Sequence, residues 1–97
     1  MPRFNVEHKS KWACFSTISD TFVTEFTSKT EYEQWRIEEY GRDNYKPAEK
    51  CNIYTIAEAI EAASLNNPKD FVIKNLVEAG IDKAEAKALW KAHHKGI

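Results

Sequence analysis

The sequence predicts an α+β protein in which a small antiparallel sheet of three strands and one helix precede a part made of three helices. Residues 3–26 alternate between apolar and polar side chains with a period of two, which is typical of strands. Beyond residue 28 the apolar side chains recur at helical spacing, and N-terminal capping signals precede the stripes. The length of 97 residues fits one domain, which we divide into a β-meander with a helix (1–41), a loop (42–54) and a helical part (55–97).

The three strands are expected within the first 26 residues. Residues 3–8 alternate regularly and form the first strand. Residues 11–18 are partly apolar on both sides, which indicates the central strand of the sheet. The Ser19-Asp20 pair predicts a tight turn, and residues 21–26, which are rich in β-branched and aromatic side chains, predict the third strand.

The first two helices are predicted by capping boxes, in which a Ser or Thr hydroxyl and a Glu three residues later satisfy the first free amides of the helix. Ser28 and Glu31 form one such box, before a helix over residues 29–40. Thr55 and Glu58 form another at the start of the second helix.

Polar residues, a proline and a glycine mark the ends of the last two helices. Asn67 as N-cap and Pro68 at the first helical position predict the start of the third helix. Gly80 predicts its end. Asp82 begins the fourth helix, in which Trp90 is one of the largest apolar groups.

The remaining segment, residues 42–52, shows neither the period of two that is typical of strands nor the spacing of apolar residues that is typical of helices. It is predicted to be a loop that connects the β part to the helical part. Tyr40 precedes it, Tyr45 lies within it and Tyr54 follows it. With five Phe, four Tyr and three Trp, the chain has more aromatic residues than so small a core requires, and Tyr and Trp are typical interface anchors. We therefore take Tyr45, Tyr54 and Trp90 as candidate partner-binding residues. The alternative for the tyrosines, that they simply cover the loop, stays open.

Composition and charge exclude several classes of protein. The net charge is −1, with −3 on residues 1–66 and +2 on residues 67–97, which is no signature of nucleic-acid binding. No apolar run approaches the roughly 20 residues needed to cross a bilayer. We expect a cytoplasmic protein in which Cys14 and Cys51 are reduced, although one disulfide between them stays possible.

No constellation of residues indicates catalysis, a metal or a cofactor. No Ser, Thr or Cys lies in a nucleophile motif, and three glycines are too few for a phosphate-binding loop. His93 and His94 are adjacent, so on a helix they point about 100° apart and do not share a metal. We predict that the protein is not an enzyme and acts by binding a larger macromolecule.

One alternative is a nucleic-acid-binding module. Residues 76–89 predict a helix, a Gly80-Ile81 turn and a second helix, which resembles half of a helix-hairpin-helix whose turn amides hold a DNA phosphate. The usual second glycine is missing, and Asp82 stands in its place, where its charge would repel phosphate. Direct DNA binding is therefore not expected. A further alternative is an unrelated phage regulatory protein that acts by interaction.

The order of strands and helices and the Ser64-Leu65-Asn66-Asn67-Pro68-Lys69-Asp70 junction resemble the anti-RecBCD proteins of lambdoid Salmonella phages, over all 97 residues. The resemblance implies a phage-encoded protein that binds the host RecBCD helicase–nuclease, mainly through its RecC subunit. It implies that binding inhibits or modifies RecBCD and its Chi recognition, which protects phage DNA and promotes phage recombination.

The resemblance also implies a host peptidyl-prolyl isomerase as a second partner, with Pro68 as its point of action. An X-Pro bond prefers the trans form by only about 0.5–1 kcal/mol, so a cis form is accessible. Two expectations conflict here: a trans Pro68 in the first turn of a helix, or an exposed loop over residues 66–69. The candidate partner-binding residues of this junction are Asn67, Pro68 and Lys69.

Overall fold

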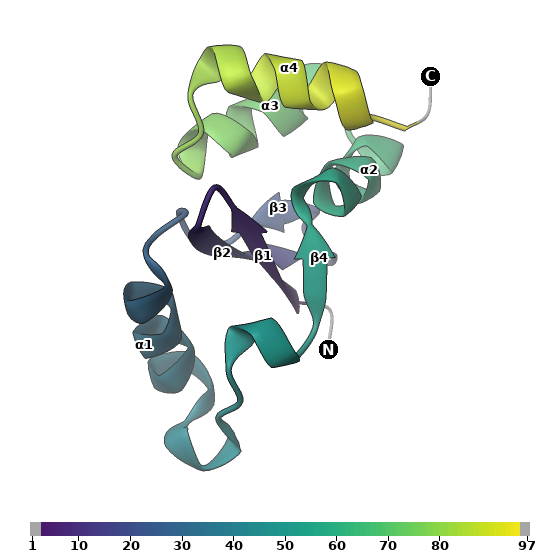
Figure 1. The fold of residues 1–97 in the computed structure, drawn as a ribbon. Helices are drawn as coiled ribbons and strands as arrows, with labels where there is room; N and C mark the ends of the chain where they lie inside the picture. Colours follow the sequence, from purple (N-terminus) through teal and green to yellow (C-terminus); the bar gives the residue numbers. More distant parts are fainter. Residues whose placement is uncertain (1–2, 96–97) are drawn as a thin grey trace.

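The computed structural model describes residues 3–95, except for the side chain of Asn44, so the outermost residues of the expected domain 1–97 lie outside the described part. Its centre is one mixed sheet of four strands in the order β3-β2-β1-β4. One helix covers one face of the sheet and three helices lie on the other (Figure 1). The strands are β1 (Arg3–His8), β2 (Lys11–Ser16), β3 (Thr21–Phe22) and β4 (Ile53–Thr55). The helices are α1 (Lys29–Tyr40), α2 (Ile56–Asn66), α3 (Lys69–Glu78) and α4 (Lys83–His93).

The prediction of a three-stranded antiparallel sheet is wrong, because a fourth strand joins the sheet in parallel. β4 pairs with β1, with Asn5 opposite Ile53 and Val6 opposite Tyr54. It lies at the end of the predicted loop 42–54, which also contains two short 3₁₀ turns, Arg42–Asn44 and Ala48–Lys50. The chain therefore returns to the sheet before it enters α2, and the expected separation into a β part and a helical part does not hold.

The expected third strand, residues 21–26, is reduced to the two residues of β3. The reason is a change of hydrogen-bond partners: the Thr24 hydroxyl, in place of a backbone carbonyl, accepts from the Cys14 N–H (3.0 Å). The Phe26 N–H turns away to the Ala79 carbonyl (2.9 Å), outside the sheet. Likewise the expected strand 11–18 ends at Ser16.

β2 supplies side chains to two separate hydrophobic clusters, which explains why both of its faces are buried. Ala13 and Phe15 point into the larger cluster, between the sheet and α2, α3 and α4. Trp12 and Cys14 point into the smaller one, with Tyr32 of α1. The apolar character of both faces is thus the mark of a central strand.

The predicted capping box of α2 is present, since both reciprocal bonds between Thr55 and Glu58 are formed (3.1 Å each). The box predicted at α1 is formed only in part: the Ser28 hydroxyl accepts from the Glu31 amide (3.2 Å), but the Glu31 carboxylate accepts from that hydroxyl (3.1 Å) and not from the Ser28 backbone amide. The start of α3 differs from the prediction by one residue, since Pro68 is the N-cap.

The reason for that shift lies in the side chain of Asn67. Its amide donates back to the Ala63 carbonyl (2.9 Å), so Asn67 closes α2 and does not cap α3. Among residues 3–95, no helix combines the length and the apolarity that crossing a bilayer requires.

Candidate interaction surface

The junction between α2 and α3 lies at the surface and is held in one conformation by Asn67. The Asn67 amide also donates to the Asp20 carboxylate (3.3 Å), which ties the junction to the turn before β3. Pro68 and Lys69 are exposed, and residues 3–95 contain no cis peptide bond, so the Asn67–Pro68 bond is trans. Pro68 is thus trans as the helix expectation requires, although it is the N-cap and not the first helical residue. The expected loop over residues 66–69 is wrong, because Asn66 ends α2 and Lys69 begins α3, but Pro68 between them is exposed.

Trp90 of α4 meets this junction. The Lys69 ammonium lies over the Trp90 ring, 5.1 Å from its centroid, and the ring of His94 stacks on the same indole with centroids 3.9 Å apart. The Trp90 indole N–H is buried and has no hydrogen-bond partner among the described residues. The half-buried indole is therefore part of the floor of the surface, below Lys69.

Large exposed apolar side chains surround the junction. Leu65, at the end of α2, is 65% exposed, and Phe71, at the start of α3, is 40% exposed. Ile18, in the turn that Asp20 connects to Asn67, is 80% exposed. Sequence reasoning missed these three residues, although the short spacing of Leu65 and Phe71 around Pro68 was a visible signal. Apolar side chains gathered at a surface are typical of interaction sites.

The two candidate tyrosines do not belong to this surface. The Tyr45 hydroxyl donates to the Glu33 carboxylate (2.9 Å), and the Arg36 guanidinium lies 5.8 Å from its ring. Tyr54 of β4 stacks on Phe4 with centroids 3.9 Å apart and packs against the larger cluster. Tyr45 therefore connects the segment after α1 to that helix, and Tyr54 is part of the packing around the larger hydrophobic cluster.

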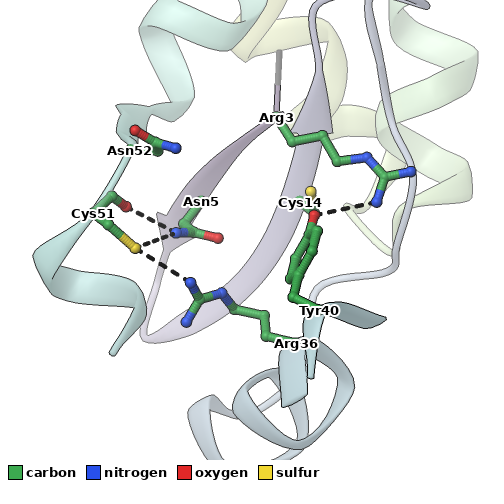
Figure 2. Close-up of a pocket in the computed structure, with 7 residues that line it drawn as sticks. All are labelled: Arg3, Asn5, Cys14, Arg36, Tyr40, Cys51 and Asn52. Atoms are coloured by element: carbon green, nitrogen blue, oxygen red, sulfur yellow. Dashed lines mark hydrogen bonds between the residues drawn. The ribbon is translucent and has the colours of Figure 1, made fainter. Parts of the chain in front are cut away.

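A small pocket of about 140 Å³ lies between β1, α1 and the segment before β4 (Figure 2). Both cysteines line it, far apart in sequence, and both are free thiols. The Cys51 sulfur accepts hydrogen bonds from Arg36 Nη2 (3.2 Å) and, more weakly, from Asn5 Nδ2 (3.8 Å). Burial raises the pKa of the Cys14 thiol, which disfavours its nucleophilic thiolate form.

The polar groups of this pocket fasten the chain before β4. Asn5 donates to the Cys51 carbonyl (2.8 Å), and Arg36 donates to the Lys46 carbonyl. The Arg36 charge is balanced by Glu33, at 2.9 Å. These contacts give the pocket a structural role, in which it holds β4 beside β1.

Within residues 3–95, no three His, Cys, Asp or Glu side chains are grouped so as to hold a metal ion.

In the turn between α3 and α4, the backbone amides donate hydrogen bonds to carbonyls at the end of α3. The Gly80 N–H donates to the Val77 carbonyl (2.9 Å), and the Ile81 N–H donates to the Leu76 carbonyl (3.1 Å). Both hydrogens are taken up inside the protein, so neither points outward to hold a phosphate as in a helix-hairpin-helix.

Val77 of α3 is 39% exposed and lines a groove beside α4. No family model, curated protein or solved structure matches this chain.

Proposed function

We propose that this chain is a phage protein that binds the host RecBCD helicase–nuclease, mainly through RecC, in the host cytoplasm. It acts by contact, without catalysis of its own, and inhibits or modifies RecBCD activity and Chi recognition. Phage DNA ends are thereby spared or directed into phage recombination. The partner is taken from the resemblance of the chain to anti-RecBCD phage proteins. The observation that supports a binding role is the exposed α2–α3 junction with its apolar neighbours.

The physical argument concerns the exposed apolar side chains. A chain of 97 residues buries only about 60–65% of its unfolded surface, so it has few large apolar groups to spare. Leu65 and Phe71 nevertheless stand in solvent on either side of Pro68. Burying such side chains against a partner contributes about 25 cal/mol per Å² of apolar area removed from water, from which the entropic costs of association are subtracted.

The test is co-elution of the purified protein with purified RecBCD in high salt and without DNA. We expect a stable complex with the wild type and a weaker one with Leu65→Asp/Phe71→Ser. Glu38→Gln/Glu39→Gln, on exposed positions of α1, serves as the control and should bind as the wild type does. Absence of a wild-type complex would sink the proposal. Tight DNA binding by the protein alone, with a steep salt dependence, would favour the nucleic-acid-binding alternative.

A host peptidyl-prolyl isomerase is the proposed second partner, at Pro68. The exposure of Pro68 and Lys69 gives an isomerase access to the Asn67–Pro68 bond. We predict that Pro68→Ala reduces co-purification of the isomerase severalfold and leaves RecC binding mostly intact. Quantitative mass spectrometry of the purified complex measures both, and unchanged isomerase recovery would contradict the prediction.

A further inference from the structure

A groove with a volume of about 600 Å³ lies between α3 and α4. It lies at the end of the molecule opposite the segment between α1 and β4 (Figure 1). Ile73 and Val77 of α3 supply the apolar part of its lining. Ile73 is almost fully buried, whereas Val77 stands partly in solvent, so the floor of the groove has apolar surface to offer.

Lysines surround that apolar floor. Lys69 and Lys74 come from α3, and Lys83 and Lys87 come from α4. None of the four forms an ion pair with a described residue, in contrast to Arg3, Lys9, Lys29 and Arg36 elsewhere. Asp70 and Glu78 also line the groove, which leaves a net charge of +2. The groove thus carries uncompensated positive charge around an apolar centre.

We propose that this groove is the docking site for an acidic segment of RecBCD that also carries aliphatic side chains; the assignment of the partner rests on the proposed function. The carboxylates of such a segment complement the four lysines, and its aliphatic groups cover Val77. A protein segment fits better than nucleic acid because a sugar-phosphate backbone has no aliphatic side chain to cover the apolar floor of the groove.

The test compares two charge-reversal variants with an equal change in net charge. Lys83→Glu/Lys87→Glu alters the groove, and Lys46→Glu/Lys50→Glu alters two exposed lysines at the opposite end. The affinity of each variant for purified RecBCD is measured by surface plasmon resonance at physiological salt. We expect the groove variant to bind at least tenfold more weakly and the control within about twofold of wild type. Lys83→Gln/Lys87→Gln gives a milder version in case charge reversal disturbs the fold, which circular dichroism checks.

The outcomes separate this inference from the proposed function. If the wild type binds RecBCD and both variants weaken this binding equally, the proposed function stands, but the groove is not the docking site. No wild-type binding to RecBCD overturns both. Two other results also overturn the inference: duplex DNA binding by the protein alone that the groove variant loses, or a wild-type dimer that the groove variant dissolves. In the first case the groove binds nucleic acid, and in the second it binds a second copy of the chain.

Discussion

Asn5 is the residue on which the position of β4 depends most directly. It is 6% exposed, it accepts from the Tyr32 hydroxyl (2.5 Å), and it donates to the Cys51 carbonyl (2.8 Å). We predict that Asn5→Leu lowers the free energy of unfolding by about 2–4 kcal/mol, because it removes the partner of the buried Tyr32 hydroxyl and that of the half-buried Cys51 carbonyl. Urea denaturation measures the loss.

Two further variants test whether the loss comes from these bonds. Tyr32→Phe removes one partner, so its cost and that of Asn5→Leu should add to more than the cost of the double variant. Glu7→Gln, exposed in the same strand, should change stability by no more than about 0.5 kcal/mol. Strictly additive costs for Asn5 and Tyr32 would contradict the proposed link between them.

The buried thiol of Cys14 predicts a loss of stability at alkaline pH. Burial raises its pKa above the ordinary value of 9.0, so the folded protein keeps the proton that the unfolded chain gives up. The contribution of the thiol to the unfolding free energy is therefore complete at pH values below that ordinary pKa. It is lost as the pH rises above it, by at most about 1.4 kcal/mol per pH unit. The pKa of Tyr32 is raised too, mainly by burial, and adds to the fall at still higher pH.

The measurement is urea denaturation at a series of pH values between about 8 and 10, a range set by the ordinary thiol and phenol pKa values. Cys14→Ala should flatten the slope of unfolding free energy against pH. Ser19→Ala, which changes an exposed residue without an ionisable group in this pH range, should leave that slope unchanged. The same slope in wild type and Cys14→Ala would refute the assignment to the thiol.

Among the elements, α2 is the one whose start is best defined. Thr55 ends β4 and caps α2 at the same time, since its hydroxyl accepts from the Glu58 amide and its own amide donates to the Glu58 side chain. We predict that Thr55→Ala lowers the unfolding free energy by about 1 kcal/mol, and that Thr55→Ser recovers most of it. Thermal unfolding followed by circular dichroism measures both, and a Ser variant as unstable as the Ala variant would count against a capping role.

The helices were predictable from the sequence because their end signals are local. Ser28, Thr55 and Asp82 each cap an amide two or three residues away, so short patterns contain the information. β4 was not predictable in this way. Its three residues follow an aperiodic segment, and they form a strand only because β1, about 48 residues earlier, offers an edge. A run of Ile, Tyr and Thr was its one local signal.

The candidate surface was predictable to the same limited degree. The exposure of Pro68 follows from a helix–helix junction, and Asn67, Pro68 and Lys69 are neighbours in sequence. The contact of Lys69 with Trp90 and the bond of Asn67 to Asp20, 47 residues away, depend on how the elements pack. The lysine groove likewise exists only because α3 and α4 lie side by side. Tyr45 and Tyr54 were selected for their residue type, and packing places them elsewhere.

At the scale of the whole molecule, β2 is the common wall of both hydrophobic clusters. The larger cluster contains Trp90 at its edge, and the smaller one contains Trp12 and Trp35. Because alternate residues of one strand serve both, loss of either cluster exposes the other side of the same strand. The two clusters should therefore unfold together, as in most small single domains.

The tryptophans allow a direct test of that cooperativity. Trp90→Phe leaves fluorescence only from the smaller cluster, and Trp12→Phe/Trp35→Phe leaves it only from the larger one. In each variant we predict that the urea midpoint from fluorescence coincides with the midpoint from far-ultraviolet circular dichroism. The comparison is made within one variant, so a general loss of stability does not affect it. Separate midpoints in either variant would mean that one face of the sheet opens alone, and that a partner could select such an open form.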